Sequence, residues 1–147
     1  MTGNEDGAPP PASVAFLAMA LGRRIREHVE GRLREHGIGL RHLSALGHLH
    51  RQPGISYSEL ARRAGVTPQS MQDTLRLLEK LGAVERSTVP GRGRTAVLRV
   101  TDEGHRLRLE GQSAITAADA VIGETSAEFA AALGAALARF SEAEDEG

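Results

Sequence analysis

Side chains on one predicted helix are suited to reading the edges of nucleic acid bases. The helix is predicted over Pro68–Leu81, and polar groups recur on it at the spacing i, i+3, i+4 and i+7, which places them on one face: Gln69, Gln72, Asp73 and Arg76. A glutamine can pair bidentately with adenine, an arginine with guanine, and a carboxylate can accept from cytosine N4. Because the major groove of B-DNA is about 12 Å wide and admits one α-helix, we expect this face to enter it. Taken alone, the same pattern is also typical of a solvated helix face.

A second, shorter helix and a tight turn are predicted to position this face. The helix covers Tyr57–Ala64, with Ser56 and Glu59 at the spacing of a capping box. Gly65 suits a left-handed helix end, and Thr67 followed by proline suits the N-cap of the next helix. Two helices separated by a short glycine-containing turn indicate a helix-turn-helix. Ser70, with the free backbone N–H groups at the start of the second helix, suits a phosphate contact. Ser56 and Thr67 are further candidate DNA-binding residues at the helix starts.

A β-hairpin is predicted directly after the helix-turn-helix. Its strands cover residues 83–88 and 95–101, and the turn between them contains proline and glycine. Three arginines are predicted near its tip: Arg92, Arg94 and, on the second strand, Arg99. We expect the tip to contact the DNA backbone or the narrower minor groove.

Longer helices are predicted on both sides of this unit. They cover residues 13–37, 40–51 and 102–122, and a last helix begins where Thr125 and Glu128 have capping-box spacing. The predicted fold is therefore mainly α with a small β-hairpin wing: a winged helix-turn-helix flanked by long N- and C-terminal dimerisation helices.

This order predicts the domain organisation. The segments are a disordered tail at 1–12, an N-terminal dimerisation helix at 13–38, a winged helix-turn-helix DNA-binding domain at 39–101, C-terminal dimerisation helices at 102–142 and a frayed acidic end at 143–147. The terminal helices carry apolar stripes, formed by Leu17, Leu21, Ile25, Phe129, Leu133, Leu137 and Phe140. We expect a two-fold homodimer to bury them and to space two reading helices about one DNA turn apart. Alternatively, the stripes fold back onto the winged domain of the same chain.

The composition is that of one globular domain. The chain has 147 residues, 40% of them hydrophobic, and no cysteine, which excludes disulfides and thiolate chemistry. Its net charge of −1 conceals eight basic and four acidic side chains in residues 59–100, against three basic and ten acidic in residues 101–147. The basic part can attract a polyanion.

No P-loop, nucleophile elbow or dinucleotide fingerprint is present, so we expect no enzyme. Without an apolar run of membrane-spanning length or a leader, we expect a cytoplasmic protein.

The central part of the sequence resembles the MarR family of transcriptional regulators. The resemblance rests on residues 59–70 (ELARRAGVTPQS), 78–86 (LEKLGAVER) and 93–104 (GRTAVLRVTDEG), and it extends over about residues 13–141. It implies a homodimer with interlocked first and last helices and two helices that read a pseudo-palindromic double-stranded DNA site. It also implies a repressor controlled by a small ligand, often an aromatic acid.

Some positions depart from the family pattern. Arg92 stands where the family usually has aspartate, Asp73 where a basic residue is frequent, and Arg76 where aspartate is frequent. The exchange of charge between positions 73 and 76 suggests an altered target sequence rather than lost DNA binding.

A small acidic effector requires a cationic or polar partner beside an apolar wall. The candidates on the first two helices are Arg23, His28 and His42, for a small aromatic or phenolic effector. No cofactor is expected to be required, and no set of histidines with zinc-ligand spacing is evident, although a zinc site assembled from distant segments stays open. The alternative function is a winged-helix protein-interaction module without specific DNA binding. A winged-helix regulator of another class, with different dimerisation, is a further alternative.

Overall fold

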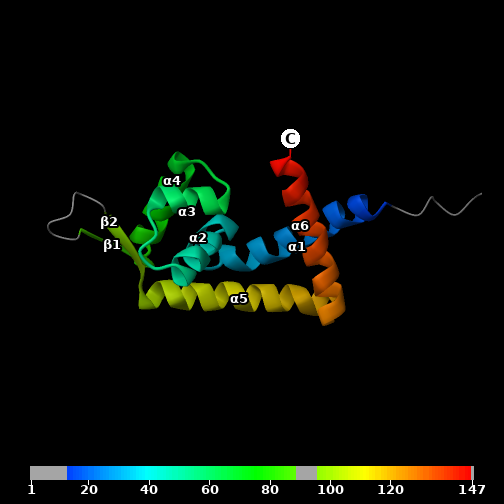
Figure 1. The fold of residues 1–147 in the computed structure, drawn as a ribbon. Helices are drawn as coiled ribbons and strands as arrows, with labels where there is room; N and C mark the ends of the chain where they lie inside the picture. Colours follow the sequence, from blue (N-terminus) through cyan, green and yellow to red (C-terminus); the bar gives the residue numbers. More distant parts are fainter. Residues whose placement is uncertain (1–12, 89–95, 147) are drawn as a thin grey trace, which may run out of the picture.

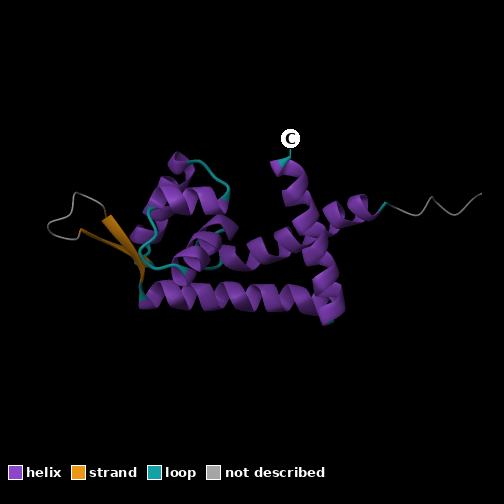
Figure 2. Cartoon of the chain, viewed as in Figure 1, coloured by secondary structure: helices purple, strands orange, loops and turns teal. Residues whose placement is uncertain are grey.

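The computed structural model describes residues 13–88 and 96–146 as six helices and one β-hairpin (Figure 1 and Figure 2). In chain order they are α1 (Val14–Arg34), α2 (Leu40–Arg51), α3 (Tyr57–Ala64), α4 (Pro68–Lys80), β1 (Val84–Thr88), β2 (Ala96–Val100), α5 (Asp102–Ile122) and α6 (Ala127–Asp145). The mainly α fold with a hairpin wing is confirmed. The predicted tail at 1–12 and the hairpin tip, with Arg92 and Arg94, lie outside the described residues.

An apolar core holds α2, α3, α4 and the hairpin together. It contains buried leucines from each of these helices: Leu46, Leu49, Leu60, Leu75 and Leu78. The strands pair antiparallel, with Val84 opposite Val100, and Leu98 of β2 is buried in the same core. Burying one such side chain contributes about 1.5–3 kcal/mol. The core therefore fixes α4 firmly against the rest of the winged unit.

A compact junction joins the hairpin to α5. Thr101 Oγ1 accepts the N–H of Gly104 at 3.1 Å and donates to the carbonyl of Gly82 at 2.5 Å. The Thr101 N–H donates to the Ala83 carbonyl at 3.0 Å. Gly104 is required here because a Cβ on it would lie 2.1 Å from the Ala83 carbonyl oxygen. The end of α4, the hairpin and the start of α5 are thereby held together.

The terminal helices expose large apolar surfaces. The second half of α1 packs on α5 and buries Val29 and Leu33, whereas its first half leaves apolar side chains exposed: Val14, Phe16, Leu17, Met19 and Leu21. α6 is bent by 108° from α5 and buries none of its residues, all of which the structure describes. Its exposed stripe is Phe129, Leu133, Leu137 and Phe140. In a single copy these side chains stay exposed, whereas Ile25 of the predicted α1 stripe packs against the core.

Among the described helices, none is by itself long and apolar enough to cross a membrane. The bent pair of α5 and α6 meets that test jointly, by length and composition only.

Some predicted boundaries differ from the structure. α1 ends at Arg34 instead of near Gly37, because residues 35–37 form a turn that closes with Gly37 at a φ of 75°. The last helix is capped by Ser126, which accepts the N–H of Phe129 at 3.1 Å, and not by Thr125. α6 extends to Asp145, past the predicted helical end at 142, because these residues are mostly alanine and glutamate, which favour helix.

Candidate nucleic-acid interface

α3 and α4 form the predicted helix-turn-helix, and a side chain caps each helix. Ser56 Oγ accepts the N–H of Glu59 at 3.2 Å, and Thr67 Oγ1 accepts the N–H of Ser70 at 3.1 Å. Gly65 ends α3 with a φ of 69°, a left-handed conformation that strains residues with a Cβ. These local interactions set the direction in which α4 leaves the turn.

α4 buries one face and leaves the other accessible. The buried face consists of Met71, Thr74, Leu75 and Leu78. The Thr74 hydroxyl donates to the Ser70 carbonyl at 3.0 Å, so this buried polar group has a partner. The residues predicted to contact bases lie together on the accessible face: Gln69, Gln72, Asp73 and Arg76. Gln72 is half-buried, and the other side chains are exposed.

Two of these residues form an ion pair within α4. Asp73 Oδ1 lies 3.1 Å from Arg76 Nη1, and the side chains are 53% and 67% exposed. Their i, i+3 spacing allows such a contact. Asp73 and Arg76 were predicted as separate base contacts, and the ion pair between them was not predicted.

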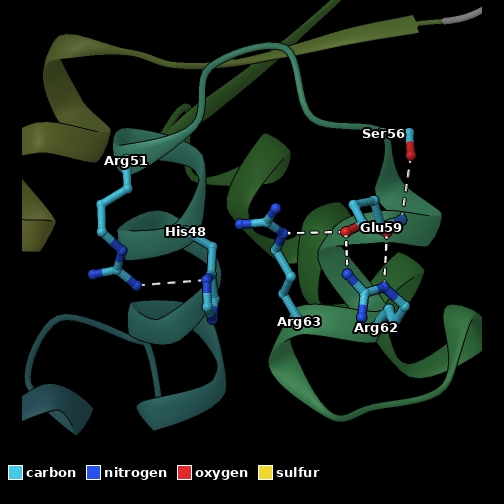
Figure 3. A network of polar contacts seen from close by, with 6 residues as sticks. All are labelled: His48, Arg51, Ser56, Glu59, Arg62 and Arg63. Carbon is cyan, nitrogen blue, oxygen red and sulfur yellow. Dashed lines mark hydrogen bonds and ion pairs between the residues drawn. The ribbon is translucent and has the colours of Figure 1, made fainter.

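A carboxylate on α3 binds two arginines (Figure 3). Glu59 accepts from Arg62 Nε at 2.9 Å and from Arg63 Nε at 3.2 Å. Hydrogen bonds to Arg62 and Arg63 lower the pKa of Glu59 to about 2. The predicted capping box is therefore only half formed: Ser56 caps α3, but the Glu59 carboxylate turns to the arginines.

Arg63 lies between Glu59 and the side of α2 that carries His48 and Arg51 (Figure 3). Burial, and then the charges of Arg51 and Arg63, lower the pKa of His48 below its ordinary value. Its Nδ1 lies 3.5 Å from Arg51 Nη2. Arg51 on α2 and Arg62 and Arg63 on α3 are cationic side chains of adjoining helices that were absent from the predicted site. The i, i+3 spacing of Glu59 and Arg62 was the available signal.

The structure corrects two expected backbone contacts. The N–H of Ser70, expected to be available for phosphate, donates to Thr67, so the hydroxyl of Ser70 remains for such a contact. Arg99, placed near the hairpin tip by the sequence analysis, lies near its base, where its guanidinium donates to Glu85 on the opposite strand. Arg92 and Arg94 are outside the described residues.

An ion pair connects α4 with the hairpin. Arg86 Nε on β1 donates to Glu79 Oε1, near the end of α4, at 3.0 Å. Together with the junction at Thr101, this contact relates the position of the hairpin to the accessible face of α4.

A cavity of about 640 Å³ lies between α1 and α5. His28, one of the predicted ligand residues, lines it together with Arg24 and Glu27, and apolar side chains from both helices complete the wall. Arg23 does not line the cavity. A shift by one residue rotates a side chain by about 100° around a helix, so choosing between adjacent arginines requires knowing how α1 packs.

His42, another predicted ligand residue, is buried and supports the start of α2. Its Nδ1 accepts the N–H of Gly39 at 2.9 Å, and Glu30 Oε1 accepts the N–H of Leu40 at 3.3 Å. Burial, followed by the charge of Arg41, lowers the pKa of His42, while Glu30 opposes this shift. The predicted ligand residues therefore do not form one site, because His42 is a capping residue.

Other histidines also approach one another. The rings of His50 on α2 and His105 on α5 meet edge to face, with centroids 5.4 Å apart. Within residues 13–88 and 96–146, no group of three or more histidine or carboxylate side chains is arranged to hold a metal ion.

Comparisons with known proteins agree with this architecture. Residues 36–95 match the model of the MarR family. The HTH-type transcriptional repressor Rv2887 of Mycobacterium tuberculosis is 36% identical over 114 residues, which cover 78% of this chain and 82% of the relative.

Two crystal structures of Mycobacterium tuberculosis MarR family protein Rv2887 are also similar. The complex with salicylic acid has a TM-score of 0.64 and 33% identity, covering 92% of this chain and 98% of that chain. The complex with DNA has a TM-score of 0.67 and 32% identity, covering 88% and 98%. The chain belongs to the MarR family of transcriptional regulators.

Proposed function

We propose that two copies of this chain bind double-stranded DNA as a transcriptional repressor, with α4 of each copy in a major groove. The accessible polar face of α4 carries the proposal, because it combines groups suited to adenine and guanine on a helix held by a buried apolar face. The DNA complex of the mycobacterial relative supports it. We also propose that the protein acts in the cytoplasm, because its proposed target is chromosomal DNA.

The test compares a duplex selected from random DNA with an unselected one. Arg76→Ala is expected to weaken binding to the selected duplex by about 1–3 kcal/mol, because it removes a base contact. The unselected duplex should lose less affinity. Arg34→Ala, which removes an exposed arginine from α1, is the control. Equal losses on both duplexes for Arg76→Ala would contradict its role as a base reader.

We propose that the second copy covers the apolar stripes of α1 and α6. Eight large apolar side chains of α1 and α6 are at least 40% exposed in one copy: Val14, Phe16, Leu17, Met19, Leu21, Leu133, Leu137 and Phe140. Monomeric soluble proteins rarely expose contiguous apolar patches of this kind. A two-fold axis through them would place two copies of α4 on the same side, about one helical turn of DNA apart.

We propose that a small aromatic or phenolic acid modulates DNA binding from the cavity between α1 and α5. Arg24 and His28 supply a cation and a polar ring, and Leu21, Ile25 and Val121 supply apolar wall. The relative solved with salicylic acid supports this ligand class. The start of α5 is hydrogen-bonded to the end of α4 and the hairpin through Thr101. A ligand that binds more tightly to one arrangement of α5 on α1 therefore changes the fraction of dimers that can bind DNA.

Salicylic acid is the probe for this proposal. It is expected to lower the affinity of the wild-type protein for the selected duplex. Arg24→Ala should bind that duplex normally without the acid and respond to it weakly, whereas Arg23→Ala, the matched control, should respond as the wild type does. An unchanged response in Arg24→Ala would contradict this placement of the ligand.

A further inference from the structure

Arg76 differs from its neighbour Arg62 in the donors that its ion pair occupies. Arg62 donates both Nε and Nη2 to Glu59, so the two parallel N–H groups along the side of its guanidinium are taken. Arg76 contacts Asp73 through Nη1. Asp73 therefore leaves the parallel Nε and Nη2 donors of Arg76 to another acceptor.

The donors that Asp73 leaves match one base edge. Guanine presents O6 and N7 side by side in the major groove, and an arginine reads them with two parallel N–H groups. The side chain of Arg76 is 67% exposed on the accessible face of α4. A guanidinium already held by Asp73 loses less conformational freedom on contacting the base than an unrestrained one.

The pair contributes little to the stability of the fold. Both side chains are more than half exposed and belong to the same helix, where exposed ion pairs have small effects on stability. The effect of removing Asp73 on DNA recognition is therefore separable from any effect on folding.

The charge of Asp73 also opposes the competing use of Arg76. DNA phosphates flank the groove, and an arginine on the recognition helix can bind them without regard to sequence. A carboxylate 3.1 Å from the guanidinium repels phosphate. It thus favours the base edge over the backbone as the partner of Arg76.

From this geometry, we infer that Asp73 is a specificity-determining residue that positions Arg76 for a guanine in the DNA site. The inference rests on the proposed DNA-binding function. It assigns to Asp73 a positioning role through Arg76, in place of a direct contact with cytosine.

The test measures the affinity of the full-length protein for the selected duplex, for single-base variants of that duplex and for an unselected duplex. Asp73→Ala should reduce the preference for guanine at one position by about tenfold, because the guanidinium is no longer held. It should also bind the unselected duplex more tightly, with a salt dependence steeper by about one unit, because one negative charge is removed.

Asp73→Asn separates position from charge. Its side-chain oxygen can still accept from Arg76 Nη1, so the guanine preference should be largely retained while binding to the unselected duplex is strengthened. Arg76→Ala should lose the preference at the same base position. Thermal denaturation of each variant checks that the fold is kept.

Three outcomes would overturn the inference. In the first, folded Asp73→Ala keeps the guanine preference. In the second, Asp73→Ala loses a preference for cytosine at a position that Arg76→Ala does not affect, which would make Asp73 a direct reader. In the third, Asp73→Asn and Asp73→Ala lose the guanine preference equally. If the wild-type protein selects no duplex, the proposed function itself fails, which is a distinguishable result.

Discussion

His42 is buried at the start of α2, where Nδ1 accepts the Gly39 N–H. Its folded-state pKa lies below the ordinary value of 6.5, chiefly because burial disfavours the charged ring. As the pH falls, the His42 imidazole is therefore protonated at a higher pH in the unfolded chain than in the folded chain. The stabilisation is fully present above pH 6.5 and is lost as the pH falls through 6.5 toward the lower, folded-state pKa.

We predict that the free energy of unfolding falls between about pH 7.5 and pH 5.5, and that His42→Gln makes this dependence shallower. Glutamine retains an acceptor for the helix start but does not titrate. Chemical denaturation across this range measures the effect. His28→Gln, at an exposed position of α1, is the control; a variant at position 42 with the wild-type slope would refute the account.

Gly104 allows α5 to approach the hairpin closely. Gly104→Ala is expected to lower the free energy of unfolding by about 1–3 kcal/mol, because the new Cβ meets a backbone carbonyl that cannot move freely. Gly31→Ala, in α1, adds a Cβ with no atom within 4 Å and should be neutral or stabilising. Urea denaturation compares the two, and equal stabilities would show that the junction is looser than the structure indicates.

Among the elements, the winged unit was predictable because its signals are local. Ser56, Gly65 and Thr67 act within one helical turn, and the helices that they bound begin and end within one residue of their predicted positions. The hairpin followed from its glycine-rich turn and β-branched strands in the same way.

The features that could not be predicted from the sequence are contacts in which a side chain has several possible partners. The capping box requires the Glu59 carboxylate to accept from the N-cap backbone, but it accepts from Arg62 and Arg63 instead. The cavity between α1 and α5 joins segments far apart in the chain, so only their packing distinguishes Arg24 from Arg23. Periodicity defines the face of a helix, but it does not define such long-range contacts.

The side chain of Thr67 caps the start of α4. Thr67→Ala is expected to lower the free energy of unfolding by about 1 kcal/mol, because the Ser70 N–H loses its acceptor. Thr67→Ser retains a hydroxyl and should restore most of this loss. Denaturation curves measure the free energy of unfolding of both variants. An equal loss in Thr67→Ser and Thr67→Ala would contradict the capping role.

The apolar stripes of α1 and α6 predict self-association. Leu137, on α6, is 70% exposed in one copy. Leu137→Glu is expected to weaken the dimer by about 2 kcal/mol or more, because it removes apolar burial and places a charge in the interface.

Analytical ultracentrifugation measures this change. Leu109→Glu places the same charge on an exposed leucine of α5, outside both stripes, and should leave the dimer intact. A wild-type protein that is monomeric at micromolar concentration would contradict the proposed dimer. Equal dissociation of the dimers of both variants would contradict the placement of the interface on these stripes.

A dimer of this chain is proposed to bind DNA through its paired recognition helices and many phosphate contacts. The most direct measurement is its affinity for a selected duplex as a function of salt. With six to ten phosphates neutralised, the affinity should fall by about 10³- to 10⁵-fold between 50 and 200 mM salt. Absence of binding at low salt, or an affinity that salt leaves unchanged, would contradict the claim and favour a protein-interaction module.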